Sequence, residues 1–124
     1  MRQFDIHLGD DVLTVAVTFK ASAEISQAVG DIFLIARESA KEALFDSKGI
    51  DYEPKWRFTL ENVTKILHIG ARAAGSKLTY EQIGEMVVNT GMFQAKDEAG
   101  RYLAAIAAPG SEEVKPTKGG DAGK

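Results

Sequence analysis

The stretch FDIHLGDDVLTVAVTF, residues 4–19, decides the fold because it predicts a β-hairpin. Apolar and polar residues alternate on both sides of Gly9, and a period of two places one face of a strand on a core and the other in water. Gly9, Asp10 and Asp11 predict the turn, since Gly and Asp tolerate a positive φ. The residues expected to face the core are Phe4, Ile6, Leu8, Leu13, Val15, Val17 and Phe19. A hairpin alone is marginally stable in water, so this one must pack against helices or another chain.

Residues 22–46 predict helix, because their apolar side chains recur at three-to-four spacing. Ser22 is the expected N-cap. Gly30 interrupts the pattern, and Asp31 can cap a new helix. We therefore expect either a short helix to Val29 followed by a longer one from Asp31, or one kinked helix. The stripe expected to face the core consists of Ile25, Val29, Ile32, Phe33, Ala36, Ala40, Ala43 and Leu44.

Three further helices are predicted, over residues 59–74, 80–90 and 92–107. Thr59 is the expected cap of the first. Thr79, with Gln82 three residues later, has the pattern of a capping box for the second. Glycines follow the first two helices, and a proline–glycine pair follows the third, which suits helix ends.

Two segments lack a helical pattern. Residues 47–57, SKGIDYEPKWR, predict a loop because glycine and proline interrupt any stripe. Residues 109–124 hold one large apolar side chain, and such a composition cannot offset its ordering entropy, so a disordered tail is expected. The expectation is therefore one α+β domain over residues 1–108, mostly helical, with an N-terminal β-hairpin followed by four or five helices.

Composition limits the classes of function. The formal net charge is −3 and the pI about 5.4, whereas nucleic-acid binders usually carry a basic patch or a basic balance. The absence of cysteine excludes thiol chemistry, thiolate metal sites and disulfides. The start of the chain has no apolar signal core, and no apolar run is long enough for a membrane span. A cytoplasmic protein that does not act on membranes or nucleic acid is expected.

No catalytic, cofactor-binding or metal site is expected, and the chain is predicted not to be an enzyme. His7 and His68 are isolated from each other in the sequence, whereas a metal site needs several ligands close together. The glycines match neither a phosphate-binding loop nor a dinucleotide fingerprint. The serines sit in no recognised nucleophile motif, although a triad assembled from distant residues stays open.

Residues 59–91 also resemble the opening of a helix-turn-helix. Basic and acidic side chains balance in this segment: Lys65, Arg72 and Lys77 against Glu61, Glu81 and Glu85. A unit that reads a DNA groove needs phosphate contacts from basic side chains. An ordinary helical hairpin is therefore the favoured interpretation.

The order of the elements resembles a known family. The segments are IHLGDDVLTVAVTF (6–19), ASAEISQAVGD (21–31), ILHIGARAAG (66–75), LTYEQIGEMVVNTG (78–91) and YLAAIAAPG (102–110). Together they are similar to the small tail assembly chaperones of long-tailed bacteriophages, especially the group shared with gene transfer agents. The matching positions are Gly9, Gly30, Gly75, Leu78, Thr79 and Gly91. The segment 37–57 is longer than in that family.

The resemblance implies a protein that binds the tape measure protein, keeps it soluble in the host cytoplasm during tail assembly, self-associates and catalyses nothing. Binding a helical apolar client needs an apolar groove. The candidate partner-binding residues are Tyr52, Trp56, Phe58, Met92 and Phe93, each of which could instead fill the core. Two alternatives remain: a structural tail component retained in the particle, and a small helix-turn-helix regulator that binds DNA.

Overall fold

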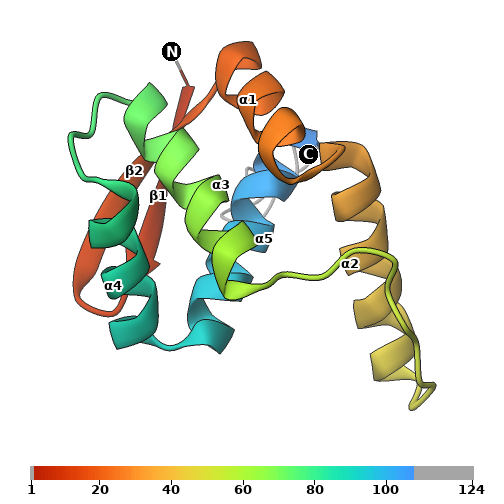
Figure 1. The fold of residues 1–124 in the computed structure, drawn as a ribbon. Coiled ribbons are helices and arrows are strands. Elements are labelled where there is room, and N and C mark those ends of the chain that lie inside the picture. The colour runs from red at the N-terminus through yellow and green to blue at the C-terminus, as the bar shows by residue number, and fades with distance from the viewer. Residues whose placement is uncertain (1, 108–124) are drawn as a thin grey trace, which may run out of the picture.

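The structure, a computed structural model, describes residues 2–107. It confirms the predicted α+β class: a two-stranded antiparallel hairpin followed by five helices (Figure 1). The elements are β1 (Arg2–Leu8), β2 (Asp11–Val17), α1 (Phe19–Val29), α2 (Ile32–Ser47), α3 (Leu60–Ala73), α4 (Tyr80–Thr90) and α5 (Met92–Ala107). The expectation of a disordered tail at 109–124 concerns residues outside the described ones.

The hairpin forms with Leu8 paired to Asp11 across a two-residue turn, so Asp11, which was expected in the turn, starts β2. Gly9 takes a positive φ of 65°, a conformation that glycine adopts at no steric cost. The alternation buries the predicted face through Ile6, Leu8, Leu13 and Val15. Phe19 departs from the prediction. It starts α1 instead of ending β2, and it is 88% exposed.

The segment predicted as one kinked or two separate helices forms two. Gly30 has a φ of 127° and separates them, and Asp31 caps α2 by accepting a hydrogen bond from the Phe33 backbone N–H. The prediction of Ser22 as N-cap is wrong, because α1 starts one turn earlier. Thr18 is the cap, and its Oγ1 accepts from the Ala21 backbone N–H at 3.1 Å.

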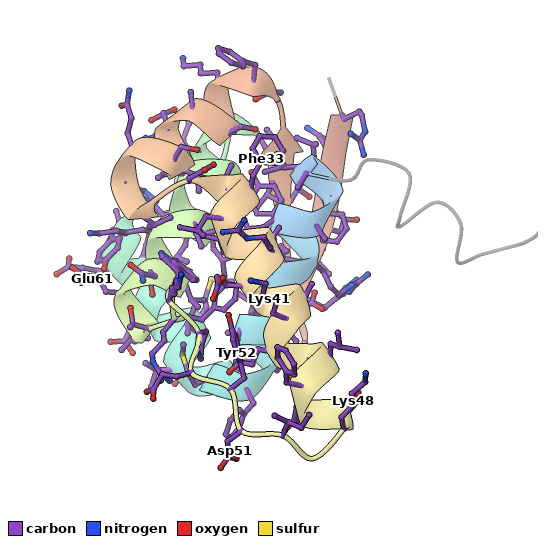
Figure 2. The ribbon with its side chains drawn as sticks, turned by 90° about the vertical axis from the view of Figure 1, so that its right-hand side faces the viewer. Phe33, Lys41, Lys48, Asp51, Tyr52 and Glu61 are labelled. Carbon is purple, nitrogen blue, oxygen red and sulfur yellow. The ribbon has the colours of Figure 1, made fainter. Side chains whose placement is uncertain are left out.

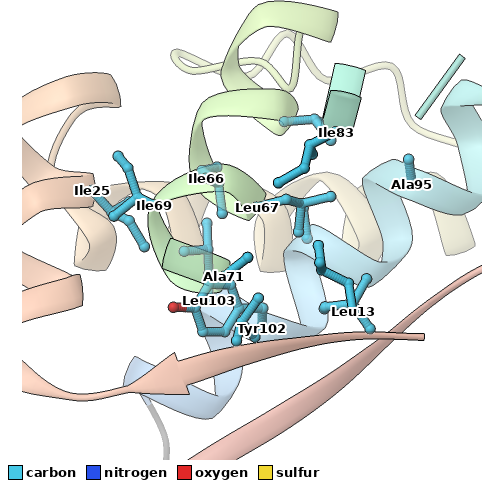
Figure 3. Close-up of a cluster of buried hydrophobic side chains, with 14 of the residues drawn as sticks. Leu13, Ile25, Ile66, Leu67, Ile69, Ala71, Ile83, Ala95, Tyr102 and Leu103 are labelled. Atoms are coloured by element: carbon cyan, nitrogen blue, oxygen red, sulfur yellow. The ribbon is translucent and has the colours of Figure 1, made fainter. Parts of the chain in front are cut away.

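Helix α3 forms the centre of the core, with seven of its fourteen residues buried. It packs against β2, α1, α4 and α5 (Figure 3). At Gly70 the Tyr102 side chain of α5 lies against α3, since a Cβ there would lie 2.5 Å from the Tyr102 hydroxyl. The absence of a side chain at Gly70 therefore lets the Tyr102 ring of α5 lie close to the backbone of α3.

Helix α2 is buried much less than predicted. Only Ile32, Ile35 and Glu38 of its sixteen residues are buried. Phe33 and Leu44, placed on the core stripe by the sequence pattern, are 69% and 51% exposed. The pattern failed here because α2 packs along one narrow line, on α5 and weakly on α1, so that part of the apolar stripe stays uncovered.

Helix α4 begins and ends as predicted, and α5 begins as predicted. Thr79 and Gln82 form the capping box, with reciprocal hydrogen bonds of 2.8 and 3.1 Å. Gly91, with a φ of 106°, separates α4 from α5. Within residues 2–107, no helix combines the length and the apolar character that crossing a membrane requires.

Candidate protein-binding groove

A groove of about 680 Å³ lies between α2 and α5. The two helices run in opposite directions on one side of the molecule (Figure 1), and Figure 2 views this side with α2 in front. Its volume falls within the roughly 300–1,000 Å³ of pockets that bind small ligands. Its lining residues are Ile35, Ala36, Ser39, Ala40, Glu42, Ala43, Asp46, Phe58, Lys96, Asp97, Gly100, Arg101, Leu103 and Ala104.

Small side chains are the reason for the open space. The walls carry four alanines, a serine and a glycine, which cannot reach across to the opposite helix. The deep part is apolar, because Ile35 and Leu103 are almost fully buried. Phe58 also lines the groove, and it lies 3.9 Å from where a Cβ on Gly100 would be. The groove is thus an apolar channel whose own walls leave it unfilled.

Exposed apolar side chains continue both walls. On α2, Phe33 and Leu44 share a helical face with the lining residues Ala36 and Ala40 by three-to-four spacing. On α5, Phe93 lies one turn before the lining residue Asp97 and is 87% exposed. Contiguous apolar surface rimmed by polar residues marks interaction sites on proteins.

The charges along the groove are unevenly paired. Glu42 and Lys96 join the two walls at 4.0 Å. Arg101 pairs with Glu98 of its own helix at 2.8 Å. Asp46 and Asp97, which also line the groove, have no ion-pair partner among residues 2–107.

The segment between α2 and α3 is tied to α2 by a buried carboxylate. Glu38 is 1% exposed, and its Oε1 accepts from the Lys55 backbone N–H at 2.9 Å and from the Tyr52 hydroxyl at 2.7 Å. These two hydrogen bonds lower the pKa of Glu38 below its usual value, and the bond between the two side chains raises the pKa of Tyr52. The second oxygen, Oε2, has no hydrogen-bond partner in the described chain, with Lys41 Nζ 4.0 Å away.

Trp56 fastens the same segment to the corner between α1 and α2. Its indole N–H donates to the Val29 carbonyl at 2.8 Å, and its ring lies beside Gly30, where a Cβ would come within 3.5 Å. The Trp56 and Phe58 rings meet edge to face with centroids 4.8 Å apart. The indole therefore touches the aromatic ring that lines the groove.

The five residues predicted to bind a partner fall into four settings. Tyr52 and Trp56 are half-buried and hold the inter-helix segment in place. Phe58 alone lines the groove, while Met92 packs partly buried against the core. Phe93 is free of the core, at the start of α5. The sequence interpretation missed the α2 wall, because its alanines and Phe33 were assigned to the core.

The structure does not support the other candidate functions, DNA binding and metal binding. The outer face of α4, which would be the DNA-reading helix, carries Glu81 and Glu85, and the helix contains neither Lys nor Arg. His68 lies against the Tyr80 ring. In the described part of the chain, no three His, Asp or Glu side chains come together as a metal site would require.

Searches against protein-family models, curated proteins and solved structures found no match to this chain. The geometry of the groove and the sequence resemblance are therefore what bear on function.

Proposed function

We propose that the protein is a tail assembly chaperone, which binds the tape measure protein of a phage or a phage-derived particle in the host cytoplasm. The observation that carries the proposal is the unfilled apolar groove between α2 and α5, continued by the exposed Phe33, Leu44 and Phe93. The order of hairpin and helices, which resembles that chaperone family, supports it independently.

The groove suits a helical client. In helix-in-groove recognition, an amphipathic helix inserts side chains at i, i+3, i+4 and i+7 into an apolar channel. Walls of alanine and glycine let the client backbone approach closely, so that its larger side chains supply the missing volume. Leaving Phe33 and Phe93 in water costs free energy that a client helix would recover by covering them.

The experiment is co-expression with the cognate tape measure protein. We expect the soluble yield of the tape measure to rise and the two proteins to co-purify. Ala40→Arg should block the groove, because Ala40 lies on its α2 wall and is itself exposed, so that the fold tolerates the change. Ala28→Arg is the matched control, since Ala28 is an exposed alanine of α1 outside the groove.

Loss of co-purification in Ala40→Arg but not in Ala28→Arg is the expected result. A tape measure protein that stays soluble alone and forms no complex at micromolar concentration contradicts the proposal. Presence of the chain in purified particles, at a fixed ratio to tube subunits, would instead assign it as a structural tail component.

A further inference from the structure

Two carboxylates that line the groove have no paired cation in the described chain. Asp46 stands on the α2 wall and Asp97 on the α5 wall, and neither has an ion-pair partner among residues 2–107. The cations that also line the groove, Lys96 and Arg101, are paired with Glu42 and Glu98.

The position of Asp46 is also unfavourable with respect to the dipole of its own helix. It lies in the last turn of α2, where the carbonyl groups give the helix end a partial negative charge, and that turn contains no basic residue. A carboxylate there is locally unfavourable, and a nearby cation would relieve the repulsion. Lys48, which follows the helix, is not among the lining residues.

We infer that the groove selects an amphipathic helix with a Lys or Arg beside its apolar stripe, and that this basic side chain lies between Asp46 and Asp97. The inference rests on the proposed function only in taking the partner to be helical. The apolar channel supplies most of the affinity, and the two carboxylates fix which helices bind and in which register. Complementary charges at the edge of an interface act in this way on register and specificity.

The test uses two fluorescein-labelled 18-residue peptides that share one leucine stripe and carry either Lys or Glu on its flank. Fluorescence anisotropy on the full chain at low salt gives both dissociation constants. The Lys peptide should bind about fivefold more tightly, the size expected from two partly exposed ion pairs. The preference should shrink at high salt, because surface charges are screened.

The double variant Asp46→Asn, Asp97→Asn should bind both peptides with nearly equal affinity. Asp51→Asn, which removes an exposed carboxylate outside the groove, should leave the fivefold preference intact. Ala40→Arg should abolish binding of both peptides, while Ala28→Arg should not. Equal affinities in the unmodified chain, or a preference that survives in the double variant, would overturn the inference.

Failure of this inference is separable from failure of the proposed function. If neither peptide binds but the tape measure protein still co-purifies, the chaperone proposal stands and the inference falls. If sedimentation shows a dimer that Ala40→Arg dissociates, a second copy of the chain occupies the groove, which also overturns it.

Discussion

Tyr102 occupies the space that a side chain at Gly70 would need, with its hydroxyl 2.5 Å from the position of a Cβ there. The same hydroxyl donates a 2.6 Å hydrogen bond to the carbonyl of Ala16 in β2. One side chain of α5 thus sets the spacing to α3 and connects α5 to the sheet. Burial raises the pKa of Tyr102 well above its usual range, so the hydroxyl stays protonated and can donate.

Gly70→Ala should therefore destabilise the protein by about 1–3 kcal/mol, the usual cost of overpacking a core. The measurement is urea unfolding at neutral pH. Gly84→Ala is the matched control, because a Cβ there meets only Thr64 Cγ2, at an ordinary 3.6 Å. That helical glycine should gain about 0.5–1 kcal/mol on becoming alanine. Equal effects at the two sites would show that α3 and α5 are less closely packed.

Replacing Thr18 by Ala should cost about 1 kcal/mol of stability, because its side chain caps α1. Ser22→Ala should cost less, since Ser22 lies inside the helix and its hydroxyl bonds only to the Thr18 carbonyl. Thermal unfolding of both variants tests the position of the helix start. A larger loss from Ser22→Ala than from Thr18→Ala would contradict the cap seen here.

Glu38 should make part of the folding stability depend on pH in the acidic range. Its pKa is lowered in the folded protein from the usual 4.5, chiefly by the Lys55 N–H and then by Tyr52. The contribution is complete above the unfolded pKa and is lost as the pH falls through the lower, folded value. The stability gap between the unmodified chain and Glu38→Gln should therefore be larger at pH 7 than near pH 3.

Asp51→Asn controls for removing a carboxylate from the segment that Glu38 holds, since Asp51 is exposed. Unfolding curves for the three proteins across that pH range give the comparison. A gap between the unmodified chain and Glu38→Gln that stays constant with pH would show that the Glu38 carboxylate does not hold Tyr52 and Lys55 as described.

Trp56 should report occupancy of the groove. It is the only tryptophan, and its ring contacts Phe58, which lines the groove. A helix that packs on Phe58 should shift the intensity or wavelength of the Trp56 emission, saturating with the affinity found by anisotropy. Phe58→Leu, which removes the ring between the two, should reduce the change. A signal that is insensitive to saturating client would place the client elsewhere.

The elements that the sequence predicted well have local signals. The break at Gly30, the cap at Asp31 and the capping box of Thr79 and Gln82 each depend on residues within four positions of one another. Such signals act through backbone conformation and nearby hydrogen bonds, and tertiary packing did not override them. Phe19 was misassigned because the strand alternation continues through it, although Thr18 is also a good cap.

Most of the candidate site could not be predicted from the sequence, because its contacts join residues that are far apart along the chain. Glu38 meets Tyr52 and Lys55 across 14 and 17 positions, and no periodicity marks that encounter. On α2, a three-to-four stripe of apolar residues predicts burial. The stripe does not reveal how many other helices or strands are available to cover it. Phe33 and Leu44 remain in water because α5 covers only one line of the helix. Of the five predicted partner residues, Phe58 and Phe93 lie in or beside the groove.

The limited burial of α2 has a consequence for local unfolding of the protein. The helix buries three residues, whereas α3 buries seven, and it is held by its packing on α5 and by the hydrogen bonds that Glu38 accepts from Tyr52 and Lys55. Its backbone amides should exchange with deuterium by a partial opening that leaves the hairpin, α3 and α5 protected. The amides of α2 would then exchange faster than those of the hairpin, α3 and α5. Displacing α2, which forms one wall of the groove, to admit a bulky client would then cost only a fraction of the free energy of global unfolding.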